Sequence, residues 1–220
     1  MTTAPHAPAA ADAAETDASV SAAEQTRAAA LGAVLFRNRG WLPVPFVAVP
    51  LLAPSQLGPG QYVRAWVVGA LLVVFGEAFR LAGVAAAGTV TRRRSRTVQR
   101  LVTYGVFAWM RNPLYVGNFF AWLGVVVASG VLWFLPVAAL LFAVEYTLIV
   151  RYEEGVLESI FGGEYLAYKA RTPRWLPRPP RAPEHGPHAW GEALRSEVST
   201  LLQYVGLAAA LGVKHWVTTR

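Results

Sequence analysis

Residues 114–150 read LYVGNFFAWLGVVVASGVLWFLPVAALLFAVEYTLIV, and this stretch decides the fold class. Its 37 positions contain no basic residue, and Glu145 is the only charged side chain among them. A helix needs about 20 apolar residues to cross a bilayer, so the stretch is long enough for two crossings. Because Ala-Ser-Gly at 128–130 interrupts it near the middle, we predict a tight helical hairpin with spans at about 114–131 and 132–150.

The composition of the whole chain also indicates a membrane protein. Hydrophobic residues make up 55% of the sequence and charged residues only 15%, whereas a soluble domain is about 25% charged. Cysteine is absent, which excludes disulfides, thiolate metal sites and cysteine nucleophiles. The four histidines all lie outside the central apolar region. We therefore expect no metal site and no histidine-based acyl transfer there.

Two further spans are predicted before the hairpin, and one apolar segment follows it. Residues 41–57 contain four prolines, so we predict an irregular first span in which neighbouring helices satisfy the freed carbonyl groups. Residues 62–88 give a second span of the length that a bilayer requires. Residues 198–220 form either a fifth span or an amphipathic helix. The predicted fold is an all-α integral membrane protein with four to five transmembrane helices and C-terminal interfacial helices.

The sequence divides into three regions. Residues 1–28 are rich in alanine, threonine, proline and acidic residues, and we predict a disordered tail. Residues 29–197 form the membrane domain, in which 151–197 are cytoplasmic and contain an interfacial helix at 152–170 and a loop rich in proline and arginine. Residues 198–220 are the C-terminal apolar helix.

The basic residues predict which side of the membrane each loop faces. The net charge of +7 comes almost wholly from arginines, which gather at the ends of the apolar segments. The positive-inside rule places these groups in the cytoplasm: Arg37 and Arg39, Arg92 to Arg100, Arg111, Arg151, and Arg171 to Arg181. This distribution favours anionic lipid headgroups as partners and argues against nucleic acid.

Two acidic residues lie inside apolar stretches. Glu77 and Glu145 are the only acids between Arg27 and Tyr152, and an unpaired charge there costs about 2.5–3.5 kcal/mol. Glu77 and Arg80 are three residues apart on one helix, so they can pair with each other. Glu145 is close enough to the end of its span to snorkel or to reach an arginine. These residues either hold the bundle together or take part in a site, and both possibilities stay open.

The two ends of the hairpin carry a dense group of polar residues. Arg111 to Gly117 (RNPLYVG) begins the third span, and Arg151 to Glu154 (RYEE) follows the fourth. Because a hairpin returns to the same face, we expect both segments around one cytoplasmic pocket, with Pro113 starting the helix and Gly117 allowing close backbone approach. Arginine, glutamate and tyrosine side chains together suit a zwitterionic, aromatic cofactor. The alternative is a charged collar that only anchors the hairpin.

Four blocks of the sequence, taken in order, carry a resemblance to a known family. They are Gly76 to Arg80 (GEAFR), Leu101 to Trp109 (LVTYGVFAW), Arg111 to Gly117 (RNPLYVG) and Glu153 to Pro173 (EEGVLESIFGGEYLAYKARTP). The last three look like Leu-Val-Thr-x-Gly-x-Tyr, Arg-His-Pro-x-Tyr-x-Gly and Glu-Glu-x-x-Leu-x-x-x-Phe-Gly-x-x-Tyr-x-x-Tyr-x-x-x-x-Pro. In this order and spacing, over about half of the chain, they resemble the isoprenylcysteine carboxyl methyltransferase family and the related membrane phospholipid methyltransferases.

The resemblance implies a cofactor and the residues that hold it. S-adenosylmethionine would bind between the Arg-x-Pro-x-Tyr and Glu-Glu segments at the cytoplasmic face, with the acceptor entering laterally from the bilayer. The implied cofactor contacts are Tyr104, Arg111, Asn112, Pro113, Tyr115, Gly117, Glu153 and Glu154. Two positions depart from the family, because Asn112 stands where histidine is usual and Gln99 where eukaryotic members place another histidine. Asparagine still donates and accepts hydrogen bonds, so cofactor binding should survive more readily than proton transfer.

The acceptor determines which side chains would do the chemistry. Methyl transfer from a sulfonium is an in-line displacement, so the protein mainly aligns donor and acceptor. A carboxylate acceptor needs an arginine clamp, for which Arg151 and Arg80, the latter beside Glu77, are candidates. An amine acceptor must lose a proton, for which Glu154 or Glu145 is better suited. We thus predict Arg151, Glu154 and Glu145 for catalysis and Glu77, Arg80 and Arg151 for the acceptor.

Several functions compete with methyl transfer to an isoprenoid carboxylate. A phospholipid amine N-methyltransferase would use the same cofactor. An NADPH-dependent membrane reductase of the sterol type has a similar Arg-x-Pro-x-Tyr region, but the Glu-Glu to Tyr-x-x-Tyr segment favours a methyltransferase. A non-enzymatic membrane scaffold is the third alternative. The sequence leaves the acceptor and the oligomeric state open.

Overall fold

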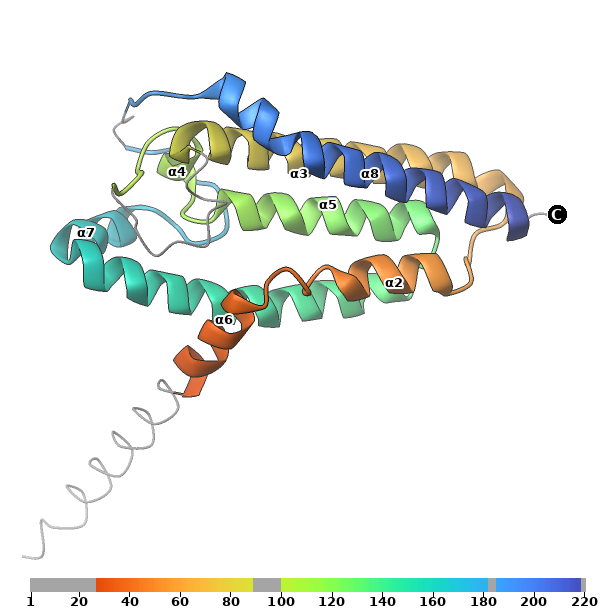
Figure 1. The fold of residues 1–220 in the computed structure, drawn as a ribbon, viewed down its shortest axis with the longest axis horizontal. Coiled ribbons are helices and arrows are strands. Elements are labelled where there is room, and N and C mark those ends of the chain that lie inside the picture. The colour runs from red at the N-terminus through yellow and green to blue at the C-terminus, as the bar shows by residue number, and fades with distance from the viewer. Residues whose placement is uncertain (1–26, 89–99, 182–184, 219–220) are drawn as a thin grey trace, which may run out of the picture.

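Helices are the only regular secondary structure in the part of the chain that the structure describes. The structure, a computed structural model, describes residues 27–88, 100–181 and 185–218. Most of the predicted tail and the arginines at 92–96 lie outside these ranges. Its helices are residues 27–37, α2 (Val44–Leu52), η1 (Pro59–Gln61), α3 (Tyr62–Ala87), α4 (Val106–Trp109), α5 (Pro113–Ser129), α6 (Phe134–Phe161), α7 (Gly163–Arg171) and α8 (Trp190–Thr218). The axes of the long helices α3, α5, α6 and α8 are roughly aligned with one another (Figure 1).

The long helices support the prediction of an all-helical membrane protein. Helices α3, α6 and α8 are each long and apolar enough to cross a bilayer, and α5 is apolar over 17 residues. At 1.5 Å per residue α5 is about 26 Å long, close to the thickness of the hydrocarbon core. Helices α5 and α6 form the predicted hairpin, and the turn begins at Gly130, whose φ of 73° lies in the left-handed region that glycine adopts without strain.

Glycines let α3 and α5 pack backbone against backbone. Gly69 and Gly76 on α3 are seven residues apart, as are Gly117 and Gly124 on α5. A Cβ on Gly117 would lie 2.5 Å from the carbonyl oxygen of Gly76, and one on Gly124 would lie 2.5 Å from that of Gly69. Small residues at such positions are the usual means by which helices associate closely in a membrane. Gly117 therefore provides the close backbone approach that the sequence predicts, and its neighbour is α3.

The region predicted as the first span, 41–57, contains a helix of only nine residues, α2. This helix is about 14 Å long, so it does not cross a bilayer by itself. Residue 54 is a proline and has no N–H for the carbonyl of Pro50. Lys214 Nζ on α8 donates to that carbonyl at 2.5 Å. A neighbouring helix thus satisfies a carbonyl freed by proline, as the sequence predicts.

The last two long helices extend further than the sequence suggests. Helix α6 continues without a break to Phe161, so the Arg-Tyr-Glu-Glu segment lies within it and no separate interfacial helix begins at 152. Helix α8 starts eight residues before 198 and runs antiparallel along α3. The N–H of Ala189 donates to the carbonyl of Ala85 at 2.8 Å at one end, and Trp66 Nε1 donates to His215 Nδ1 at 2.9 Å near the other. This pairing along the full length favours a span over an amphipathic cover.

Candidate active site

The hairpin brings Arg111 and Glu154 into direct contact, as its geometry predicts. Arg111 begins the segment that leads into α5, and Glu154 lies near the C-terminal end of α6. Arg111 Nε and Nη2 donate to Glu154 Oε1 at 3.1 and 2.9 Å. Both side chains are buried, with exposed fractions of 9% and 5%. The sequence blocks that contain them therefore meet at one end of the bundle.

Arg174 completes this ion pair, although the sequence marks it only as one of a group of basic residues. Its Nε and Nη2 donate to Glu154 Oε1 and Oε2 at 3.1 and 2.5 Å. Arg111 Nη1 donates to the carbonyl groups of Lys169 and Thr172 at 3.0 and 2.5 Å. We call Arg111, Glu154 and Arg174 the arginine lock. The guanidinium and carboxylate atoms of the lock are mostly hydrogen-bonded to one another, so few of them are free to bind a ligand. The lock therefore holds the site together.

Neighbouring residues of the family blocks hold the lock in place. Asn112 precedes the first residue of α5, Pro113, and its Nδ2 donates to the carbonyl of Arg174 at 3.1 Å. This amide contact ties the start of α5 to the segment after α7. Tyr168 on α7 donates to the carbonyl of Phe107 at 2.8 Å. Burial and the nearby carboxylate of Glu154 raise the pKa of Tyr165, so its phenol stays neutral beneath the lock.

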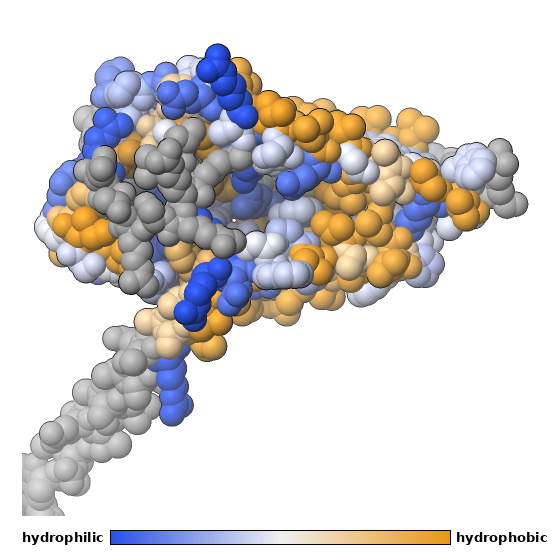
Figure 2. Space-filling model, in the orientation of Figure 1, coloured by the Kyte–Doolittle hydropathy of each residue, from blue (hydrophilic) through white to orange (hydrophobic). Residues whose placement is uncertain are grey.

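Tyr115 and Glu153 form a second contact between α5 and α6. Tyr115 Oη donates to Glu153 Oε1 at 2.9 Å, and the ring of Tyr115 lies 4.7 Å from that of Tyr146. Arg39 Nη1 lies 4.0 Å from the same Glu153 oxygen. Figure 2 shows the surface hollowed at the end of the bundle where α5 begins, with hydrophilic residues around the hollow. This end carries both the arginine lock and the Tyr115–Glu153 pair.

A cluster of polar residues surrounds Arg80 deeper in the bundle. Arg80 Nε donates to Glu77 Oε2 at 3.1 Å, which is the pairing that the sequence predicts. Its Nη1 donates to Asn118 Oδ1 on α5 at 2.5 Å, and its Nη2 donates to Glu197 Oε2 on α8 at 2.8 Å. We call these four residues the Arg80 cluster. Since all three nitrogens are engaged, Arg80 has little left with which to clamp an acceptor carboxylate.

Two other predicted residues lie elsewhere or lack the expected partner. Arg151 is exposed on the face of α6 that also exposes Leu140 and Val144, with exposed fractions of 65% and 53% for these two. That face points away from the helices of the bundle. Glu145 reaches no arginine within the described residues, and its Oε2 is buried without a hydrogen-bond partner. A buried carboxylate oxygen without a partner is costly, so Glu145 remains a candidate for a functional role.

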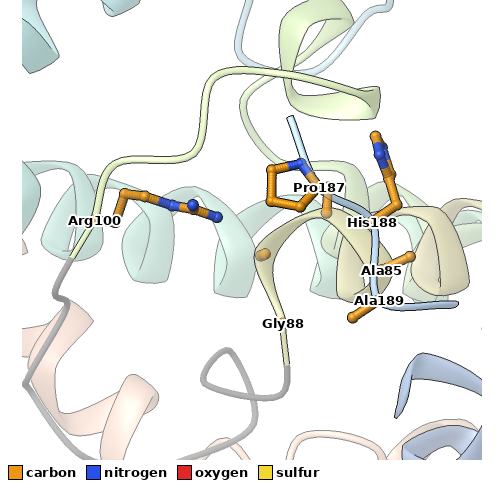
Figure 3. Close-up of a pocket in the computed structure, with 8 residues that line it drawn as sticks. Ala85, Gly88, Arg100, Pro187, His188 and Ala189 are labelled. Atoms are coloured by element: carbon orange, nitrogen blue, oxygen red, sulfur yellow. The ribbon is translucent and has the colours of Figure 1, made fainter. Parts of the chain in front are cut away.

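A pocket of about 200 Å³ lies at the C-terminal end of α3. Figure 3 shows Arg100 on one side and His188 on the other, with Pro187 between them. Tyr104 supports this pocket, because its Oη donates to the carbonyl of Ala86 at 2.8 Å and accepts from Arg100 Nη2 at 2.6 Å. Ligand pockets usually measure about 300–1,000 Å³, so this one alone fits only part of a nucleoside cofactor.

The chain is similar to membrane methyltransferases and to metal-resistance proteins. The family model described as phospholipid methyltransferase matches residues 65–164. A human protein-S-isoprenylcysteine O-methyltransferase is 38% identical over 50% of this chain and 40% of the relative, so the chain spans less than half the length of that protein. The nickel-cobalt-cadmium resistance protein NccN of Alcaligenes xylosoxydans xylosoxydans is 31% identical over 67% of this chain and 68% of the relative. No solved structure matches the chain.

Proposed function

Because this chain belongs to the family of isoprenylcysteine carboxyl methyltransferases and related phospholipid methyltransferases, we propose that it transfers a methyl group from S-adenosylmethionine to a lipid-like acceptor at the cytoplasmic face of the membrane. One observation carries the proposal. The arginine lock joins the two family blocks around Arg111 and Glu154 at the end of the bundle where the surface is hollowed (Figure 2).

Some of the side chains at this end of the bundle can bind a zwitterionic cofactor. Glu153 accepts one hydrogen bond, from Tyr115, and offers carboxylate oxygens to an ammonium or a ribose hydroxyl. Asn112 uses its amide nitrogen for Arg174 and leaves its carbonyl oxygen as an acceptor. We propose that these residues and Tyr104 contact the cofactor, while Arg111 and Glu154 hold the frame. When bound, S-adenosylmethionine supplies an activated methyl group on a sulfonium.

The preferred acceptor is the carboxylate of an isoprenylcysteine or another isoprenoid acid, which is the acceptor class that the relatives' names indicate. A carboxylate is already ionised at neutral pH, so the protein needs to supply only alignment and a dry environment. The apolar outer faces of α3 and α8 would admit an isoprenoid chain from the bilayer. Val67, Leu71 and Val74 on α3, for example, have exposed fractions of 53%, 64% and 66%.

Methylation of a phospholipid amine is the second candidate, and the buried carboxylates favour it. Glu77 Oε1 and Glu145 Oε2 are buried without hydrogen-bond partners, whereas the nitrogens of Arg80 are occupied. An amine must lose a proton before or during methyl transfer, and a buried carboxylate can take it. The description of the matching family model agrees with this acceptor.

One labelling experiment distinguishes these functions. Protein reconstituted in lipid nanodiscs would receive methyl-labelled S-adenosylmethionine with either N-acetyl-S-farnesylcysteine or phosphatidylethanolamine. We expect label in the farnesylcysteine as a methyl ester that base releases as methanol; base-stable label in the phospholipid would support the amine acceptor instead. Thermal stabilisation by S-adenosylhomocysteine is expected with either. Stabilisation by NADPH alone would favour a reductase, and no response to either ligand would support the scaffold.

A further inference from the structure

Arg39 has a guanidinium that is largely free beside the Tyr115–Glu153 pair. It lies between the helix at 27–37 and α2, and its side chain is 26% exposed. Its Cζ lies over the ring of Phe36 at 4.3 Å from the centroid. Its one charged contact within the described residues is Glu153, at 4.0 Å, which is the outer limit of an ion pair. The guanidinium is therefore held in place by packing while its N–H groups stay available.

The arginines of the arginine lock and of the Arg80 cluster are occupied, and Arg151 is turned away. Arg80 and Arg111 each use all three side-chain nitrogens in hydrogen bonds at 2.5–3.1 Å. Arg174 directs two nitrogens at Glu154. Arg151 points outward with the exposed face of α6. Among Arg39, Arg80, Arg111 and Arg174, Arg39 is the one whose guanidinium makes no hydrogen bond within the described residues, so it can bind a further anion.

Packing fixes Arg39 next to the proposed site. A Cβ on Gly32 would lie 2.9 Å from that of Tyr152, so the helix at 27–37 crosses α6 closely. The rings of Phe36 and Tyr152 lie 5.7 Å apart. This crossing places Arg39 beside Glu153, which in turn accepts from Tyr115. Arg39 lies outside the family match at 65–164, so no family block singles it out.

We propose that Arg39 binds the carboxylate of the methyl acceptor, an inference that rests on the proposed function. The planar guanidinium offers paired N–H groups that match a carboxylate. In the transfer, the carbon–sulfur bond breaks and its electrons stay on sulfur, while a carboxylate oxygen forms the new carbon–oxygen bond. No proton moves, and the acceptor changes from an anion to a neutral ester. Arg39 therefore holds the substrate more tightly than the product, which favours release of the ester.

Kinetics of two matched variants test this assignment. Arg39→Ala should raise the KM for N-acetyl-S-farnesylcysteine about 10- to 100-fold, which is the range expected for a lost charge-assisted hydrogen bond. The KM for S-adenosylmethionine should change less than about twofold. Arg37→Ala is the control, because Arg37 is an exposed arginine two residues away on the same segment. Arg39→Lys keeps the charge but loses the paired geometry, so its KM should lie between those of the wild type and Arg39→Ala.

A binding measurement separates failure of this inference from failure of the proposed function. Affinities of the farnesylcysteine carboxylate and of its methyl ester would be measured by tryptophan fluorescence without cofactor. Arg39→Ala should weaken binding of the carboxylate and leave binding of the ester unchanged. If the wild type binds the carboxylate through Arg39 but forms no ester, the proposed function is wrong and the assignment of Arg39 stands. If Arg39→Ala binds and methylates the carboxylate as well as Arg37→Ala does, the assignment is wrong.

Discussion

Replacing Glu154 by glutamine keeps the size of the side chain but removes the charge that holds the arginine lock together. Arg111 and Arg174 direct four hydrogen bonds of 2.5–3.1 Å at its two oxygens. Glutamine has one oxygen, and its NH₂ group would face N–H donors. The substitution therefore leaves the buried Arg111 without a compensating charge, whereas Arg174, at 29% exposure, retains contact with water.

The expected loss of stability is large because the pair is buried. Removing one partner of a buried ion pair costs about 3–5 kcal/mol. For a chain of this size, each kcal/mol lowers the melting temperature by about 2–4 °C, so Glu154→Gln should lower it by about 6–20 °C. Glu158→Gln is the matched control on the same helix. Glu158 pairs with Lys169, and both side chains are 35% exposed, so this change should cost about 0–1 kcal/mol.

Thermal unfolding of detergent-purified protein, followed by tryptophan fluorescence, provides the comparison. The difference between the two variants is the informative quantity, because detergent affects both equally. If Glu154→Gln melts within about 2 °C of Glu158→Gln, the arginine lock does not stabilise the junction of α5, α6 and the segment after α7. Because the arginine lock is buried, we also expect Glu154 variants to give less folded protein. Their responses to ligands should therefore be compared at equal amounts of folded protein.

Three further substitutions test the packing of the bundle by the same melting measurement. Gly76→Ala would place a Cβ against the backbone of Gly117 and should lower the free energy of unfolding by about 1–3 kcal/mol. Its control is Gly206→Ala on α8, where a Cβ would meet nothing within 4 Å, so that change should be neutral or stabilising. Equal effects of the two substitutions would contradict the close packing of α3 and α5. Lys214→Met removes the donor to the Pro50 carbonyl and should cost about 1–3 kcal/mol, so an unchanged melting temperature would mean that this carbonyl finds another partner. Arg80→Met removes the cation that Glu77 and the buried Glu197 share, so it should lower the free energy of unfolding by about 3–5 kcal/mol. Its control is Arg195→Met at an exposed position of α8, which should change stability little. Similar losses for both would mean that the Arg80 cluster does not stabilise the bundle.

The sequence predicts the long helices well where their ends carry clear signals. Helix α3 coincides with the predicted 62–88 almost to the residue, because a mostly apolar run ends at Gly88, whose φ is 76°. The end of α6 was less predictable. The charges at 151–154 resemble the end of a span, but the helix continues to Phe161, and Tyr115 and Arg111 bind Glu153 and Glu154 within it.

The residues that complete the site could be found only in part. Arg174 belongs to a group of several arginines, and spacing along the chain does not say which of them meets Glu154. Glu197 precedes an apolar stretch and looks like a solvated acid, although α8 buries it to 1% exposure against Arg80. Arg151 was predicted for catalysis and for the acceptor, but α6 continues past Val150 and exposes Arg151 on the same face as Val144, seven positions earlier.

Hydrogen exchange with and without S-adenosylhomocysteine in nanodiscs would locate the cofactor, which we propose binds where α5 begins and α6 ends. We expect protection of backbone amides in residues 100–112 and 172–178, with no change in residues 53–61 at the opposite end of the bundle. Protection limited to that opposite end, or no protection by this ligand anywhere, would contradict this proposal.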